Sequence, residues 1–252
     1  MGASEALVGV SLPVQGFLLN SVLASILKIK GTDSLTDAGL FHAFLLGWGL
    51  WSTLGVAGWA YGVAYFVFGV AVTKVKMAEK ESLGIAEKRG GARGPENVWG
   101  SAGTAMICAI ASINAPTADV ARALNVGFAA SLATKLSDTF GSEIGKAYGK
   151  TCYLITTFKL VQRGTEGAVS VEGTLAGVVA SIIMAAISVA LGLISGSSAI
   201  AAVIIAALVA TTVESYIGAI FQDNVPWLTN ELVNFVNTLI GAAVAMLLVT
   251  VA

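Results

Sequence analysis

Charged side chains are scarce in this sequence. Asp, Glu, Lys and Arg make up 12% of the 252 residues, whereas a soluble domain has about 25%. Hydrophobic residues make up 56% of the chain, and the mean hydropathy is +0.83. So few charges cannot cover a surface that faces water on all sides. The composition therefore excludes an ordinary soluble domain and predicts a membrane protein.

Histidine and cysteine are also scarce. The single histidine, His42, excludes the usual His-rich zinc sites. Cys108 lies in an apolar run and Cys152 in a polar segment, so no structural disulfide is expected. The first residues lack a basic stretch followed by a short apolar core and a cleavage site, so we expect no signal peptide there.

Long apolar runs fill most of the chain. A helix needs about 20 apolar residues to cross about 30 Å of hydrocarbon. By this length the sequence predicts an all-α integral membrane protein with about eight transmembrane helices in one domain, residues 1–252. The expected spans are Ala6–Leu27, two helices that share Gly39–Val75 and turn near Ser52–Gly55, Val98–Asn114, Ala118–Leu136, Leu175–Ile194, Ala199–Phe221 and Leu232–Val251.

The basic residues are unevenly distributed, and none follows Arg163. With eight spans, every Lys and Arg except Arg122 falls on the side of segments 28–38, 76–97, 137–174 and 222–231. Lys and Arg collect on the cytoplasmic side of a membrane or on its organelle equivalent. We therefore expect both termini on the opposite side and a polar site that faces the cytosol or stroma.

The longest polar segment, Thr134–Gly177, contains the acids Asp138 and Glu143, and Glu214 lies near the same side in the seventh expected span. A carboxylate within a span is costly and usually faces a partner or a cavity. Carboxylate oxygens suit Mg²⁺. One interpretation is therefore a metal site, with a helix break at Gly141 that brings the first two acids together.

The same acids allow an interpretation without a metal. Asp138 and Glu143 each have a lysine three residues away, Lys135 and Lys146. Ion pairs at this spacing are common on helices. Interfacial salt bridges would then explain the charges.

Glycines recur at every fourth position in this segment, as Gly141, Gly145 and Gly149 and as Gly173 and Gly177. This spacing is typical of close helix packing. Glycine also lets backbone N–H groups approach phosphate oxygens, and the interleaved lysines at 146 and 150 favour a phosphate site. No GxxxxGK[ST] precedes a helix, so the segment is not a P-loop.

Three asparagines near the C-terminus, Asn230, Asn234 and Asn237, share one face of the last expected helix. A single Asn in a span is often a packing contact of about 0.6 kcal/mol. Three on one stripe indicate the wall of a polar cavity. The loop residues either anchor at lipid headgroups or bind phosphate; they are Arg89, Arg93, Lys159 and Arg163.

Several motifs together resemble one known family. They are ENVWGSAGTAMICA, TKLSDTFGSEIGKAYGKTCYLITTFKLVQRGTEGAVSVEGTLAG, VESYIGA and TNELVNFVNTLIGA. In order and spacing they are similar to the phytyl phosphate kinase family of photosynthetic organisms, from the loop near Arg89 to the C-terminus. A fainter similarity, carried by Asp138, the Gly-xxx-Gly-Lys that follows it and EGTLAG, links the chain to CTP-using membrane enzymes such as dolichol kinase, phytol kinase and phosphatidate cytidylyltransferase.

The resemblance implies an enzyme that phosphorylates phytyl phosphate, or another polyprenyl phosphate, to the diphosphate with CTP and Mg²⁺. The product would serve tocopherol and prenylquinone synthesis. The implied location is a cyanobacterial or chloroplast membrane, with the lipid bilayer as a partner and no nucleic acid. The oligomeric state stays open.

Three roles follow for the polar residues if the resemblance holds. The catalytic set is Asp138, Glu143, Lys146 and Lys150. The metal ligands are Asp138, Glu143 and Glu214. The nucleotide and phosphate ligands are Arg89, Arg93, Asn97, Lys135, Lys159, Arg163, Thr165, Glu166, Ser170, Glu172, Thr174, Asn230, Asn234 and Asn237.

Two other functions fit the same residues. Eight spans with buried acids also suit an ion or lipid transporter, although the inverted repeats and broken helices of many transporters are not evident. The third function is that of a CTP-dependent cytidylyltransferase, which makes a CDP-lipid and releases pyrophosphate.

Overall fold

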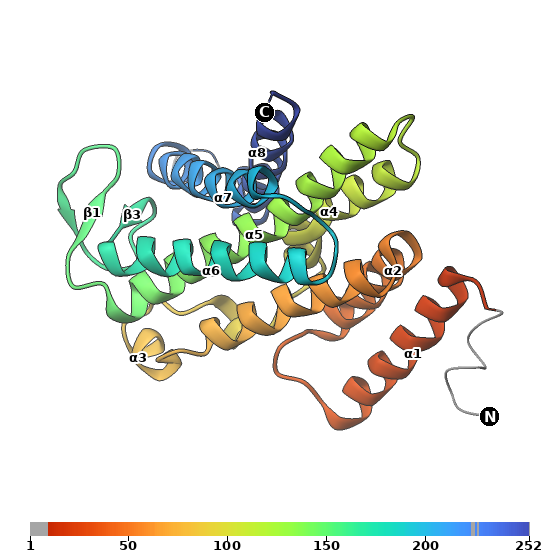
Figure 1. The fold of residues 1–252 in the computed structure, drawn as a ribbon. Coiled ribbons are helices and arrows are strands. Elements are labelled where there is room, and N and C mark those ends of the chain that lie inside the picture. Colours follow the sequence, from red (N-terminus) through yellow and green to blue (C-terminus); the bar gives the residue numbers. More distant parts are fainter. Residues whose placement is uncertain (1–9, 223–224, 226, 252) are drawn as a thin grey trace.

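A computed structural model describes residues 10–222, 225 and 227–251, and the protein is mostly helical (Figure 1). In this part of the chain the α-helices are α1 Leu12–Lys30, α2 Asp37–Thr73, α3 Met77–Ser82, α4 Pro95–Ile113, α5 Ala118–Tyr148, α6 Val171–Ala190, α7 Ser197–Ile217 and α8 Asn230–Val251. A short 3₁₀-helix, η1 Lys88–Gly91, precedes α4, and a short π-helix, η2 Gly218–Gln222, follows α7. The expected start of the first span, at Ala6, lies outside the described residues.

Five of these helices are long and apolar enough to cross a membrane. They are α1, α2, α6, α7 with its continuation to Phe221, and α8. The protein is therefore an integral membrane helical protein, as its composition predicts.

Helix α5 forms the centre of the fold and packs against α2, α4, α6, α7 and α8. Its inward positions include the fully buried residues Ala129, Ala130, Leu132, Ala133 and Leu136. Small side chains let helix backbones approach closely. Five other helices can therefore pack around α5. They fix the position of its C-terminal half, which carries the polar residues.

Helix α2 reverses direction at Gly55 (Figure 1), where φ is 63° and ψ is −153°. Positive φ is accessible to glycine at little cost. Leu50 and Gly62 are twelve residues apart, which is about 18 Å along a straight helix. A Cβ on Gly62 would nevertheless lie 2.7 Å from Leu50 Cδ1, so the two halves of α2 lie side by side. Trp51 and Trp59 pack edge to face across the same reversal, with ring centroids 5.7 Å apart. The turn that the sequence predicts here is confirmed.

Helix α5 continues without a break to Tyr148, so the expected break at Gly141 is wrong. The glycine serves helix packing instead. A Cβ on Gly173 would lie 2.5 Å from the Gly141 carbonyl oxygen, and a Cβ on Gly177 would lie 2.9 Å from that of Ser137. These glycines therefore bring the backbones of α5 and α6 into contact.

A small antiparallel sheet follows α5. Strand β1 (Cys152–Leu154) pairs with β2 (Leu160–Val161) on one side and with β3 (Ala168–Val169) on the other, in the order β2-β1-β3. The expectation of an all-α protein is corrected by these three strands. They carry the chain from the end of α5 to the start of α6 (Figure 1).

Candidate active site

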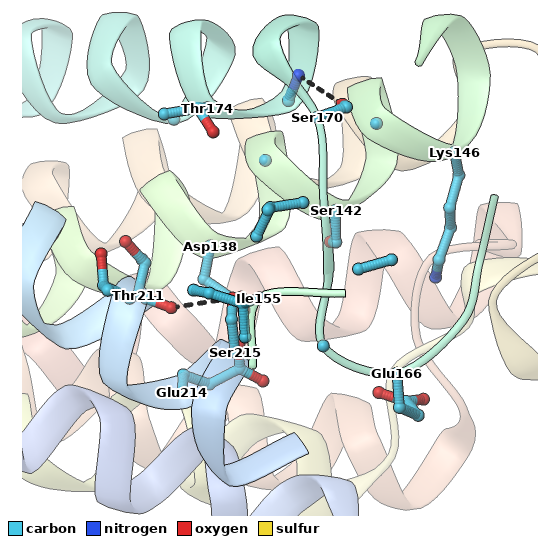
Figure 2. A pocket seen from close by; sticks show the side chains of 18 of the residues that line it. Asp138, Ser142, Lys146, Ile155, Glu166, Ser170, Thr174, Thr211, Glu214 and Ser215 are labelled. Carbon is cyan, nitrogen blue, oxygen red and sulfur yellow. Dashed lines mark hydrogen bonds between the residues drawn. The ribbon is translucent and has the colours of Figure 1, made fainter. Parts of the chain in front are cut away.

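A cavity of about 470 Å³, here called the main cavity, lies among α5, α6, α7, the first turns of α8 and the segment from β1 to β3. Figure 2 shows side chains from these elements turned toward one another. The cavity wall includes ten residues that the sequence assigns to a site. They are Lys135, Asp138, Lys146, Thr165, Glu166, Ser170, Thr174, Glu214, Asn230 and Asn234.

Lys135 connects α5 to α8 at the wall of this cavity. Its ammonium group donates to the Asp138 carboxylate at 2.6 Å and to the Asn234 side-chain oxygen at 2.8 Å. The residue is buried. A buried charge requires such partners because it has lost its water. The salt bridge that the sequence allows between Lys135 and Asp138 is therefore present.

Asp138 on α5 and Glu214 on α7 line the same part of the main cavity, and their carboxyl groups interact electrostatically (Figure 2). Two neighbouring carboxyl groups either share a proton or hold a cation between them. Among the described residues, no third His, Cys, Asp or Glu joins them. A pair of carboxylates fits Mg²⁺, which usually takes one or two from the protein and completes its shell with water and phosphate.

Glu143 does not belong to this pair. It is 1% exposed and pairs with Lys80 of α3, which is 0% exposed and also donates to the Thr73 carbonyl at 2.7 Å. At 3.6 residues per turn, five residues of unbroken helix place Glu143 about 140° away from Asp138 around α5. Glu143 is therefore removed from the expected metal set, in which Asp138 and Glu214 stay as the candidate ligands.

Lys146 extends into the main cavity from the last turn of α5 (Figure 2). Its ammonium group lies 3.5 Å from the Glu143 carboxylate, and its side chain is 23% exposed. This is the second salt bridge that the sequence allows. Lys146 therefore retains free donors toward the cavity, since an ammonium group has three N–H bonds.

Ser170 forms the N-cap of α6 by accepting a hydrogen bond from the Gly173 N–H at 3.1 Å. Thr165 and Glu166 precede it in the loop, and Thr174 follows in the first turn (Figure 2). A helix N-terminus carries partial positive charge and free N–H groups. The start of α6 therefore adds an anion-attracting wall to the main cavity.

Four residues of segment 150–172 with predicted phosphate or catalytic roles lie outside the wall of the main cavity. The Arg163 guanidinium donates to the Lys146 and Ala147 carbonyls, both at 3.3 Å, and so satisfies the end of α5. The others are in or beside the sheet segment: Lys150, Lys159 and Glu172. Their predicted roles are not supported by the geometry.

A second group lies elsewhere in the fold. Arg89 donates to Glu96 at 2.6 Å and to Asn97 at 2.7 Å. Arg93 donates to the Tyr65 hydroxyl at 2.8 Å. Arg93 and Asn97 line a separate cavity of about 170 Å³ between α1, α2 and α4. Arg89, Arg93 and Asn97, which the sequence assigns to the phosphate ligands, are therefore not part of the main cavity, although Glu87 of the same loop does line it.

Asn237 is the third member of the predicted asparagine stripe. It is 1% exposed, and neither atom of its amide has a hydrogen-bond partner among the described residues. It lies one turn beyond Asn234, on the same face of α8. Asn230 and Asn234 line the main cavity, but Asn237 lies in the interior of the bundle.

Sequence reasoning missed several hydroxyl residues of the main cavity, among them Ser142, Thr211 and Ser215 (Figure 2). Helical spacing could have found them. Ser142 follows Asp138 by four residues on α5, and Thr211 precedes Glu214 by three on α7. Residues at these spacings share a helix face. A cavity that includes the two acids therefore includes these hydroxyls.

The family described as Integral membrane protein DUF92 matches residues 20–242 of the chain. The chain belongs to this DUF92 family. The match includes every cavity residue named above and all four motifs on which the resemblance rests. No solved structure matches the chain.

Three relatives illustrate how widely the DUF92 family occurs. "Uncharacterized membrane protein sll0875" of the cyanobacterium Synechocystis is 52% identical over 91% of this chain and 88% of its own length. "Protein VTE6, chloroplastic" of Arabidopsis thaliana is 49% identical over 92% of this chain and 69% of its own length. "Uncharacterized membrane protein MJ0933" of Methanocaldococcus jannaschii is 29% identical over 92% of each chain.

Proposed function

We propose that this chain is a phytyl phosphate kinase, which phosphorylates phytyl phosphate to phytyl diphosphate for tocopherol and prenylquinone synthesis. The motif resemblance names the lipid, and the 49% identity to VTE6 over 92% of the chain supports the same role. The observation that carries the chemistry is the main cavity, where the Asp138–Glu214 pair lies beside two lysine ammonium groups. CTP is the donor that we expect from the resemblance.

The charges of the main cavity support a requirement for Mg²⁺. Its wall carries four carboxylates, of Glu87, Asp138, Glu166 and Glu214, but only two ammonium groups, of Lys135 and Lys146. Two phosphate-bearing substrates would be repelled by this excess of negative charge. Asp138 and Glu214 would hold the metal ion. When bound, Mg²⁺ neutralises charge on the transferred and bridging phosphate oxygens.

The reaction needs no strong general base. A phosphate monoester has a second pKa near 6, so its attacking oxygen is already largely ionised at neutral pH. This fits the cavity, since His42 is elsewhere, accepting from the Trp99 indole N–H at 2.8 Å. The acceptor oxygen forms a bond to the terminal phosphorus of the donor. The bond from that phosphorus to the donor's bridging oxygen breaks, and a nucleoside diphosphate leaves.

Lys146 and the first turn of α6 are suited to position the transferred phosphoryl group. The ammonium group and the helix N-terminus both attract phosphate oxygens. Positioning together with electrostatic stabilisation provides most of the catalysis in phosphoryl transfer. Thr174 adds a hydroxyl donor on the same side of the cavity, whereas the Thr165 hydroxyl donates to the Gln162 carbonyl at 2.9 Å.

The membrane topology that we propose has eight spans. The reversal at Gly55 divides α2 into halves of eighteen residues, 37–54 and 56–73, and each half is about 27 Å long at 1.5 Å per residue. With α4 and α5, these halves extend the count beyond the five helices identified by length and composition. The main cavity then faces the cytosol of a cyanobacterium or the stroma of a chloroplast.

Product analysis tests the proposal. Purified protein is incubated with phytyl phosphate and each of the four nucleoside triphosphates, with and without Mg²⁺. Phytyl diphosphate together with a nucleoside diphosphate supports the kinase. Release of pyrophosphate with a CDP-lipid would identify a cytidylyltransferase instead. Solute movement by reconstituted protein without nucleotide consumption would identify a transporter.

A further inference from the structure

The separate cavity between α1, α2 and α4, here called the side groove, is almost entirely apolar. Its wall is made by leucine, phenylalanine and other hydrocarbon side chains, among them Leu23, Leu27, Phe44, Val63 and Phe66. A hydrocarbon chain that binds to such a wall is stabilised by about 25 cal/mol for each Å² of apolar surface that it buries. With a volume of about 170 Å³, the side groove has room for part of one chain rather than for two.

One end of the side groove carries a cation without a counter-charge. Among the described residues Arg89, Arg122 and Arg163 each lie within 4.0 Å of a carboxylate, but none is found for Arg93. Its guanidinium instead contacts the Tyr65 hydroxyl at 2.8 Å and lies 5.7 Å from the centre of the same ring. A partly buried guanidinium usually has an anionic partner, and phosphate suits its planar set of donors.

The charged end of the side groove is close to the main cavity. Tyr65 interacts electrostatically with Arg93 and also with Lys135. Tyr65 and Arg93 line the side groove, while Lys135 lines the main cavity. The tyrosine therefore lies between one cation from each cavity. A phosphate bound at Arg93 would lie on the side of the groove that faces the donor nucleotide.

Helix α1, which forms one wall of the side groove, lies at the edge of the bundle (Figure 1) and packs mainly against α2. A wall made by a peripheral helix gives lateral access from the surrounding lipid. The groove can therefore accept a chain that never leaves the bilayer.

We propose that the side groove binds the isoprenoid chain of a prenyl phosphate acceptor, and that Arg93 binds its phosphate. An apolar groove for one chain with an unpaired guanidinium at its end matches a single-chain lipid phosphate in both shape and charge. The identity of the acceptor as the substrate rests on the proposed function. Lipid binding in the side groove does not depend on the proposed function, because a binding experiment can detect it without turnover.

Photolabelling tests this claim. The probe is phytyl phosphate with a diazirine on its last isoprene unit, added to the purified protein in lipid nanodiscs, and mass spectrometry identifies the labelled peptides. We expect label in α1, α2 and α4. Label confined to other helices would overturn the proposal.

Matched variants identify the two ends of the site. Arg93→Gln should reduce labelling at least fivefold. The backbone at this position should stay in place, because the residue 93 N–H donates to the Ser34 carbonyl at 3.0 Å and the Thr36 N–H donates to the residue 93 carbonyl at 3.1 Å. Ala24→Trp fills the side groove and should have a similar effect. Val22→Trp adds the same bulk at a position 57% exposed on α1 and outside the groove, and should leave labelling unchanged. Equal labelling in all three variants would contradict the assignment.

Competition separates the lipid classes. Unlabelled phytyl phosphate should displace the probe, while phytol, which lacks the phosphate, and dioleoyl phosphatidate, which has two chains, should displace it at least tenfold less well. Equal displacement by either competitor would overturn the assignment to a prenyl phosphate. Labelling in the side groove without diphosphate formation would count against the proposed kinase only, whereas diphosphate formation with label elsewhere would count against the side groove only.

Discussion

The Asp138 carboxylate accepts a hydrogen bond from the Lys135 ammonium group, 2.6 Å away on the same helix, and interacts electrostatically with the Glu214 carboxyl group on α7. Lys135 holds the aspartate in place, and in the proposed metal site Glu214 would supply the second carboxylate. The salt-bridge and metal interpretations of the sequence are therefore compatible at Asp138. Substitutions can separate its effect on chemistry from its effect on folding.

Replacement of Asp138 by Asn should reduce phytyl diphosphate formation by at least about 100-fold, since a group that stabilises transferred charge contributes roughly that much. The protein should retain its elution volume in size-exclusion chromatography. Asp119→Asn is the matched control, because Asp119 lies on the same helix with its side chain 85% exposed. Near-normal turnover in the Asp138 variant would rule out its role as a metal ligand.

Replacement of Glu214 by Gln should raise the Mg²⁺ concentration needed for half-maximal rate by about tenfold or more, because metal sites commonly lose that much affinity when a supporting group is removed. Glu81→Gln on α3, exposed and outside the main cavity, should leave the Mg²⁺ dependence unchanged. A Mg²⁺ titration of the initial rate measures both. The metal site would have to lie elsewhere if the two curves coincided.

Replacement of Lys80 by Met should destabilise the protein by about 3–5 kcal/mol, since removal of one partner of a buried ion pair leaves an uncompensated charge. The double variant Lys80→Met/Glu143→Leu should recover most of this loss. Thermal unfolding in detergent, followed by intrinsic fluorescence, gives the comparison. A double variant no more stable than the single one would show that the pair does not act as a unit.

Two glycines at the α5–α6 contact should respond differently to alanine. Gly173→Ala places a Cβ 2.5 Å from the Gly141 carbonyl oxygen, and such overpacking costs about 1–3 kcal/mol. Gly141→Ala places a Cβ 3.5 Å from the Gly173 carbonyl oxygen, its nearest neighbour across the contact, and alanine is the better helix former by up to about 1 kcal/mol. Melting temperatures should therefore fall for Gly173→Ala and stay level or rise for Gly141→Ala. The opposite order would contradict this packing.

Cys152 offers a pH-dependent test of the main cavity, which it lines. Burial, and next the Glu172 carboxylate, raise the pKa of its thiol above the usual value of 9.0. Because the thiolate is the reactive form, maleimide labelling should keep accelerating as the pH rises past 9. Mg²⁺ with CTP should slow it at least threefold. The Cys152→Ser variant, which retains Cys108, gives the background labelling. If nucleotide leaves the labelling of Cys152 unchanged, the donor nucleotide binds outside this cavity.

Local patterns in the sequence predict part of this structure and not the rest. The reversal of α2 is predictable because Gly39–Val75 is too long for one span. Asp138 and Glu214 stand out because a carboxylate is rare in an apolar run. The Lys80–Glu143 pair is different, because it joins residues 63 positions apart. Among the many basic residues of segment 74–93, nothing local distinguishes Lys80 as the buried one.

The assignment of Arg93 was limited in the same way. Its residue type suggests an anion ligand, but the choice of cavity depends on how α1, α2 and α4 pack around it. The parallel bridge between Leu35 and Arg93 ties this loop to the start of α2. A contact between segments so far apart follows from the whole bundle rather than from the composition of either segment.

The excess of carboxylates around the main cavity also bears on how the reaction would end. A diphosphate product carries more negative charge than the monophosphate from which it forms. The four acidic side chains of the wall would repel that product more strongly than its precursor. The same wall that makes a metal ion necessary for substrate binding would then favour product release. We therefore expect product release not to be the slow step of turnover.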